Sequence, residues 1–213
     1  MKYKCVIFDC DGVLVDTEDI SIGTFVEMGN KLGANIDFEF AMVNFLGKSL
    51  EYCFDYIEER CTEPFPDDFE KQYRTISFEK FKNELQAIPG VKELIEKLDV
   101  PFCVASNGPL NKIELNLRTV GLDKVFGANM FSAYQINKFK PDPALFVHAA
   151  ATLGFKPEEC AVIEDSDVGV KAGIEGGFDV FGFANPRSEA LLKKEGANIF
   201  YDMHKLYDLL EKQ

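Results

Sequence analysis

Three continuous apolar runs stand out along the chain, and each ends abruptly in polar residues. They cover residues 3–8, 100–105 and 160–163. Strands that are buried on both faces of a parallel sheet have this composition, whereas half-exposed strands alternate apolar and polar positions. The pattern therefore predicts three buried strands of a parallel sheet.

Apolar positions with helical spacing follow the second and third runs. Leu110, Ile113 and Leu117 are three and four residues apart, and Val168 and Ala172 are four apart. A repeated order of strand, polar turn and helix is typical of a doubly wound α/β fold with a mostly parallel, Rossmann-like sheet. Shorter strands are predicted at residues 130–132, 179–183 and 198–201, and further helices near 143–154, 188–195 and 203–210.

The segment between the first two runs has a different character. Helical spacing dominates from residue 17 to residue 86, and 8 of the 20 phenylalanines lie between Phe38 and Phe81. A crossover between parallel strands needs only one helix, so several helices with their own aromatic positions indicate a separate helical domain. We therefore expect an α/β core made of residues 1–16 and 87–213, with a helical domain at 17–86 inserted into it.

Charge and cysteine usage exclude several classes of partner. The chain of 213 residues carries 23 Lys and Arg against 36 Asp and Glu, a net charge of −13. An acidic surface repels phosphodiester backbones and anionic lipids, so we expect neither nucleic acid nor a membrane surface as a partner. The first apolar run is too short for a signal peptide or a membrane span, and the six cysteines form no CxxC pair. A cytoplasmic protein with reduced thiols is therefore predicted.

Polar side chains follow each of the three predicted strands. They are, in chain order, Asp9 and Asp11, Ser106 and Asn107, and Glu164 and Asp165. Because the carboxyl ends of parallel strands meet at one edge of an open sheet, we expect these side chains to converge. Four carboxylates would repel one another there, by roughly 4 kcal/mol for a pair about 4 Å apart at an effective dielectric constant near 20. A divalent cation would relieve this repulsion, and Mg²⁺ suits a site of oxygen ligands that it shares with a substrate phosphate.

Two lysines are candidates for binding an anion at this site. Lys140 lies just before a predicted helix, and Lys48 opens a predicted helix of the inserted domain. All these candidates also have a plain structural interpretation. Asp, Ser and Asn often cap helices, acidic residues favour helix N-termini, and Lys140 beside Lys138 is consistent with a solvated pair. Their order along the chain favours a shared site, because each group ends a strand or opens a helix.

Four segments carry most of these candidates: VIFDCDGVLVDT, VASNGP, KFKPDPALF and VIEDSDVGVKAG. Together they resemble the haloacid dehalogenase-like hydrolase superfamily, in its branch of phosphatases and β-phosphoglucomutase-like enzymes with a helical cap domain. The resemblance covers nearly the whole chain, and residues 84–148 are also similar to the bacterial 6-phosphogluconate phosphatases. It implies a Mg²⁺-dependent phosphatase for a small phosphorylated metabolite, a sugar or sugar-acid phosphate with 6-phosphogluconate favoured.

The resemblance also implies a role for each candidate residue. Asp9 would be the nucleophile that forms an aspartyl-phosphate, and Asp11 would be the general acid and base. The remaining roles are Mg²⁺ binding by Asp9, the Asp11 carbonyl and Asp165, with Glu164 directly or through water; phosphate binding by Ser106 and Asn107; and charge neutralisation by Lys140. Lys48 would bind the carboxylate end of the substrate from the cap.

Related chemistries stay open as alternatives. A β-phosphoglucomutase-like phosphomutase carries a histidine in the helix after the Asp-Thr pair, where this chain has Ser21, so hydrolysis is favoured. A phosphonatase would need a Schiff-base lysine in the cap, for which Lys48 is the candidate. A dehalogenase is disfavoured, because its chemistry needs neither Asp11 nor the Glu-Asp pair. A receiver domain is excluded, because it would place its phosphoacceptor after the third strand and would be about half as long.

Overall fold

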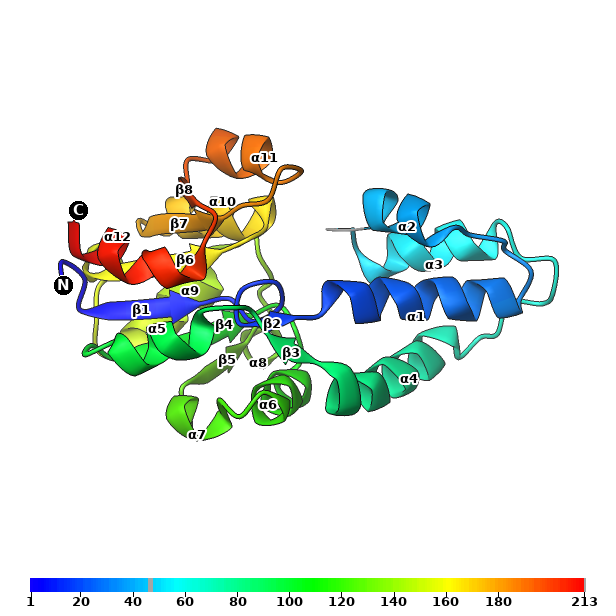
Figure 1. Ribbon diagram of the computed structural model, residues 1–213, viewed down its shortest axis with the longest axis horizontal. Coiled ribbons are helices and arrows are strands. Elements are labelled where there is room, and N and C mark those ends of the chain that lie inside the picture. Colours follow the sequence, from blue (N-terminus) through cyan, green and yellow to red (C-terminus); the bar gives the residue numbers. More distant parts are fainter. Residues whose placement is uncertain (46–47, 213) are drawn as a thin grey trace. The chain divides into compact units, whose positions relative to one another are not determined.

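The structure is a computed structural model that describes residues 1–45 and 48–212. It divides into two compact units (Figure 1). Unit 1 comprises Met1–Asp16 and Gln86–Gln213, and unit 2 comprises Thr17–Leu85. Within the described residues, every helix is too short or too polar to cross a membrane.

Unit 1 is built around a six-stranded sheet in which all neighbouring strands are parallel. The strands follow the order β5-β4-β1-β6-β7-β8. Their bounds are Cys5–Phe8 (β1), Phe102–Ser106 (β4), Met130–Ser132 (β5), Cys160–Glu164 (β6), Asp179–Phe183 (β7) and Asn198–Phe200 (β8). The three apolar runs of the sequence form β1, β4 and β6, which are neighbours in the middle of the sheet. The predicted α/β fold is therefore confirmed.

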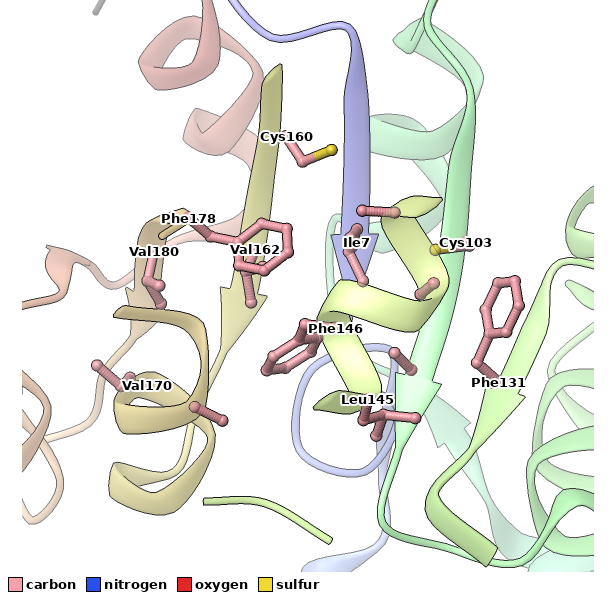
Figure 2. Packing of buried hydrophobic residues seen from close by; sticks show 14 of the residues in the cluster. Ile7, Cys103, Phe131, Leu145, Phe146, Cys160, Val162, Val170, Phe178 and Val180 are labelled. Carbon is pink, nitrogen blue, oxygen red and sulfur yellow. The ribbon is translucent and has the colours of Figure 1, made fainter. Parts of the chain in front are cut away.

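Helices pack on both faces of this sheet. They are α5 (Val91–Lys97), α6 (Leu110–Thr119), α7 (Asp123–Phe126), α8 (Ala133–Ile136), α9 (Ala144–Thr152), α10 (Asp167–Glu175), α11 (Glu189–Lys194) and α12 (Leu206–Lys212), with short 3-10 turns at Pro157–Glu159 and Met203–Lys205. Ile7 of β1 packs with Val162 of β6 and Phe146 of α9 (Figure 2). The next residue, Phe8, contacts the ring of Phe126 in α7 edge-on. Successive side chains of a strand point to opposite faces, so α7 and α9 cover different sides of β1.

Unit 2 consists of helices with an aromatic core of their own. The helices are α1 (Glu18–Lys31), α2 (Phe38–Asn44), α3 (Leu50–Glu58) and α4 (Phe69–Glu84). The ring of Phe25 is stacked on Tyr73 with 4.1 Å between the centroids, and Phe54 makes edge-on contacts with both rings. The phenylalanine-rich part of the sequence thus supplies the core of this unit.

Two short strands lie at the boundary of the units, and the sequence pattern does not reveal them. β2 (Val15–Asp16) pairs antiparallel with β3 (Gln86–Ala87), and Asp16 lies opposite Gln86. Gln86, which the sequence assigns to the inserted segment, therefore pairs within unit 1. The chain leaves unit 1 and returns to it at a single two-stranded ribbon.

Candidate active site

Asp9 directly follows β1 and is buried at its carboxyl end. Its backbone N–H donates to the carbonyl of Ile163 at 2.9 Å, which continues the pairing of β1 with β6. Its Oδ1 accepts a hydrogen bond from Lys140 Nζ at 2.6 Å. Burial raises the pKa of Asp9 to about 7, because the charge of Lys140 offsets only part of the lost hydration and Glu164 adds a like charge. Asp9 is thus a carboxylate that a cation orients and the protein shields from bulk water.

Lys140 lies at the centre of a buried group of charges. Its side chain is 3% exposed, and its Nζ lies 2.6 Å from Asp9 Oδ1 and 2.7 Å from Glu164 Oε1. The same Nζ lies 4.6 Å from the centroid of the Phe146 ring. Burial by itself lowers the pKa of Lys140, but the two carboxylates outweigh burial and raise the pKa, so the lysine stays charged. The interpretation of Lys140 as a solvated partner of Lys138 is therefore wrong.

Both oxygens of Glu164 accept hydrogen bonds from protein donors. Oε1 accepts from Lys140 at 2.7 Å. Oε2 accepts from the backbone N–H groups of Asp165 and Ser166 and from the Ser166 hydroxyl, each at 2.9 Å. The Ser166 hydroxyl oxygen in turn caps α10 by accepting from the Gly169 N–H. In the structure Glu164 thus contacts Lys140 and the start of α10. Its binding of a metal ion, directly or through water, stays a prediction.

Ser106 is the last residue of β4, and Asn107 follows it in the loop. Ser106 is buried, and its Oγ accepts a hydrogen bond from the Gly108 N–H at 3.1 Å. Asn107 Oδ1 accepts from the Lys140 N–H at 2.8 Å, and its Nδ2 donates to the Lys140 carbonyl at 3.4 Å. The side chain that is expected to bind phosphate therefore holds the backbone of Lys140 in this structure. Ser132, which the sequence does not single out, donates to the Gly108 carbonyl at 2.7 Å.

A tight turn after β1 brings the backbone close to Asp165. Gly12 has a φ of +82°, and its N–H donates to the Val15 carbonyl at 2.8 Å. A side chain at this position would overlap the Asp165 carboxylate, and its backbone conformation also favours glycine. The peptide that joins Asp11 to Gly12 therefore lies next to the Asp165 carboxylate.

Two side chains of α6 hold Asp11, and the sequence does not predict this contact. Asp11 Oδ2 forms an ion pair with Lys112 Nζ at 2.6 Å, and its Oδ1 accepts from Asn116 Nδ2 at 3.1 Å. Lys112 and Asn116 are the functional candidates that sequence reasoning missed. Their spacing of four residues places them on one face of a helix. The spacing alone does not identify Asp11 as their partner, because the contact depends on the position of α6 beside the Gly12 turn.

The acidic residues fit a metal ion that needs few side-chain ligands. In the parts of the chain that the structure describes, no three His, Cys, Asp or Glu side chains gather closely enough to bind a metal by themselves. Mg²⁺ prefers oxygen ligands and keeps several waters, so two carboxylates and one carbonyl are sufficient. The resemblance assigns these positions to Asp9, Asp165 and the Asp11 carbonyl, and the approach of the Gly12 turn to Asp165 is consistent with that assignment.

Lys48 is an exposed residue of unit 2 that lies just before α3. Its Nζ lies 5.7 Å from the centroid of the Tyr52 ring. Ser49 caps α3 by accepting a hydrogen bond from the Tyr52 N–H at 3.1 Å. Gly47, which precedes Lys48 in the segment Gly47-Lys48-Ser49, lies outside the described residues. The predicted helix start is confirmed, whereas a role of Lys48 in substrate binding stays a prediction.

Comparisons with known proteins identify the family. The model of the haloacid dehalogenase-like hydrolase family matches residues 3–177. The 6-phosphogluconate phosphatase of Escherichia coli is 35% identical over 193 residues, which cover 90% of this chain and 87% of that protein. A haloacid dehalogenase-like protein of unknown function from Agrobacterium tumefaciens has a TM-score of 0.87 and 27% identity, with 98% of this chain and 97% of that chain covered. A HAD family hydrolase from Deinococcus radiodurans, solved with bound phosphate and sodium, has a TM-score of 0.83 and 29% identity over 98% and 95% of the chains.

The chain therefore belongs to the haloacid dehalogenase-like hydrolase family, as the four sequence segments predict. Within this family it is a phosphatase. Membership of the family implies a divalent metal ion, typically Mg²⁺.

Proposed function

We propose that the enzyme hydrolyses phosphomonoesters of small metabolites through an aspartyl-phosphate on Asp9, with Mg²⁺ as its cofactor. The observation that carries this proposal is the buried contact of Lys140 with both Asp9 and Glu164. Removing three charged groups from water is costly, and such a cluster is weak evidence of a purely stabilising role. A carboxylate nucleophile beside a fixed cation is, in contrast, what transfer of a negatively charged phosphoryl group requires.

The reaction proceeds in two displacements at phosphorus. In the first, a carboxylate oxygen of Asp9 forms a bond to phosphorus, the ester P–O bond breaks, and Asp11 donates a proton to the departing oxygen. In the second, water attacks the phosphorus of the aspartyl-phosphate, Asp11 takes its proton, and the Asp9 carboxylate and inorganic phosphate separate. Lys140 stabilises negative charge on the transferring group, and the Ser106 hydroxyl binds one of its oxygens.

Asp9, the Asp11 carbonyl and Asp165 would hold the metal ion. When bound, Mg²⁺ neutralises charge between the phosphoryl group and the carboxylates. Glu164 supports the site by fixing Lys140, because its oxygens already accept hydrogen bonds from that lysine and from the start of α10. Asn107 also helps to fix Lys140, since it forms hydrogen bonds with the backbone of that lysine.

The experiment that tests the function is hydrolysis of a panel of phosphorylated metabolites with and without metal. We expect release of inorganic phosphate in MgCl₂, a loss of about 100-fold or more in EDTA, and recovery when Mg²⁺ is added in excess. Heat-inactivated protein serves as the control for free phosphate in the reagents. Equal rates in EDTA and in MgCl₂ would contradict the proposed metal site, and inactivity on the whole panel would contradict the proposed substrate class.

We infer 6-phosphogluconate as the first substrate to test. The 6-phosphogluconate phosphatase of Escherichia coli, at 35% identity over most of both chains, supports this choice. The carboxylate of 6-phosphogluconate would need a cation of its own, because Lys140 already pairs with Asp9 and Glu164. Lys48 is the candidate for this cation in unit 2. Lys48→Ala is expected to raise KM for 6-phosphogluconate by about 10-fold, the worth of one charge-assisted hydrogen bond, and to leave KM for sorbitol 6-phosphate nearly unchanged.

Lys71→Ala is the matched control for this prediction, since Lys71 is also an exposed lysine of unit 2. It should leave both KM values unchanged. Equal effects of Lys48→Ala on the two substrates would remove 6-phosphogluconate from the proposal without affecting the phosphatase assignment.

Hydrolysis should also prevail over phosphate transfer between sugar hydroxyls. Ser21 occupies the helix position at which the resembling phosphomutases carry a histidine. Incubation with β-glucose 1-phosphate should therefore yield inorganic phosphate and glucose, if the sugar phosphate reacts. Products can be separated by phosphorus NMR, with β-glucose 1,6-bisphosphate added in a parallel sample to prime any mutase cycle. Catalytic accumulation of glucose 6-phosphate would show that the enzyme is a mutase.

A further inference from the structure

Two residues of α6, Lys112 and Asn116, hold the Asp11 carboxylate at both of its oxygens. Lys112 Nζ lies 2.6 Å from Oδ2, and Asn116 Nδ2 donates to Oδ1 at 3.1 Å. Ile113 and Leu117, which follow each of them directly, are buried in the core of unit 1. These apolar side chains fix α6 in the core of unit 1. Lys112 and Asn116, one position earlier in each case, contact Asp11.

The burial of Asn116 is costly for an amide. Its side chain is fully buried, and its Oδ1 lacks a hydrogen-bond partner among the described residues. Such an atom costs about 1–3 kcal/mol, whereas a leucine of similar size would carry no such cost. The Nδ2 end of the same amide contacts Asp11. The amide thus stabilises the helix poorly but is well placed to orient the carboxylate.

Contacts at both oxygens restrict Asp11 more than a contact at one. A carboxylate held at a single oxygen still rotates about its side-chain torsions, and the second contact removes that freedom. The buried Asn116 provides the rigid contact, while Lys112, whose side chain is 18% exposed, provides the charged one. Proton transfer requires heavy atoms within about 2.6–3.2 Å of each other, so a shift of the carboxylate by an ångström matters.

We propose that Lys112 and Asn116 are positioning residues that fix the orientation of Asp11 and thereby set the site of proton transfer in both displacements. This inference rests on the proposed function, in which Asp11 is the acid and the base. Neither residue touches the reacting atoms in this role. The proposed effect of both on proton transfer is through Asp11.

The role makes the effect of a substitution depend on the leaving group. An alkoxide leaving group needs the proton from Asp11, whereas p-nitrophenolate leaves without one, and the attack of water needs Asp11 for every substrate. In Lys112→Met and Asn116→Leu we expect kcat for the best alkyl phosphate of the panel to fall about 10- to 100-fold, a part of the 10²–10⁴ that proton transfer contributes. KM should change little. With p-nitrophenyl phosphate, both variants should release a burst near one equivalent of nitrophenol before a slow steady rate.

A double-mutant cycle tests whether the two residues act through Asp11. In an Asp11→Ala background, Lys112→Met and Asn116→Leu should cause no further loss in kcat, because the group that they position is gone. Losses that multiply with that of Asp11→Ala would overturn the proposal. So would wild-type kcat and an absent burst in both single variants. Asn111→Leu and Arg118→Met, which change exposed residues of the same helix, are the controls and should behave as wild type.

The outcomes also separate this inference from the proposed function. If Asp11→Ala is impaired while both positioning variants are not, the inference fails and the proposed function stands. If Asp11→Ala itself retains wild-type kcat, the role of Asp11 in the proposed function is wrong. Circular dichroism and thermal melts establish folding. If Asn116→Leu does not fold, Lys112→Met decides the test, because the Lys112 side chain is partly exposed. Lys112→Arg, which keeps the charge, is then expected to retain most of the wild-type activity.

Discussion

Replacement of Asp9 by asparagine should leave the fold intact and reduce kcat by on the order of 10⁴-fold or more. The amide has the same shape as the carboxylate, but it does not attack phosphorus. Lys140 keeps its contact with Glu164 at 2.7 Å in the variant, so the buried cation is still paired. Phosphate release measured for Asp9→Asn and for wild type at saturating substrate, together with a thermal melt, checks both parts of the prediction.

Asp99→Asn is the matched control for Asp9→Asn, because Asp99 is exposed and lies in the same unit far along the chain. It should retain wild-type kcat. A folded Asp9→Asn protein that turns over substrate at close to the wild-type rate would rule out Asp9 as the nucleophile. Trapping of a phosphorylated wild-type enzyme, absent from the variant, would provide independent support.

Lys140→Met is expected to cause a large loss of stability in unit 1. Asp9 and Glu164 would lose the cation that both contact, at 2.6 and 2.7 Å. Removal of one partner from a buried ion pair typically costs about 3–5 kcal/mol, because the remaining charge stays in a site of low dielectric constant. Urea unfolding in metal-free buffer should show this loss as a lower transition midpoint with a similar slope. Activity should fall together with stability.

Lys138→Met provides the comparison for Lys140→Met. Lys138 is 59% exposed and pairs with Asp142 at 3.2 Å, so its removal should cost less than about 1 kcal/mol. Addition of Glu164→Gln to Lys140→Met should recover part of the lost stability, since one of the unpaired charges is then absent. A midpoint for Lys140→Met equal to that of wild type would contradict the buried triad.

The sequence predicts the part of the site that is built on strand ends. The middle of a strand that is buried between two others is apolar, so the abrupt polar residues at the carboxyl ends of β1, β4 and β6 mark the places where the sheet stops. Asp9, Ser106 and Glu164 are found in this way. Their convergence follows from the parallel order of the strands alone.

The rest depends on contacts that local sequence does not specify. The partners of Asp11 lie a hundred residues further on, and their contact depends on the position of α6 relative to the Gly12 turn. Phosphate binding by Asn107 stays a prediction, and its contacts with the backbone of Lys140 depend on a loop about thirty residues further along the chain. The sequence does not predict β2 and β3 either, because a strand of two residues is too short to show an alternation of apolar and polar positions.

The ribbon of β2 and β3 gives the helical unit the topology of a very long hairpin loop. Its two ends are fixed side by side by the pairing of Asp16 with Gln86. The entropic cost of closing a loop grows only with the logarithm of its length. The number of residues in this loop therefore has little effect on the stability of the sheet. A foreign helical segment grafted between these two residues should leave the register of β1 with β4 unchanged. The helical unit is therefore free to diverge by exchange of one continuous stretch of chain, while the sheet of unit 1 stays as it is.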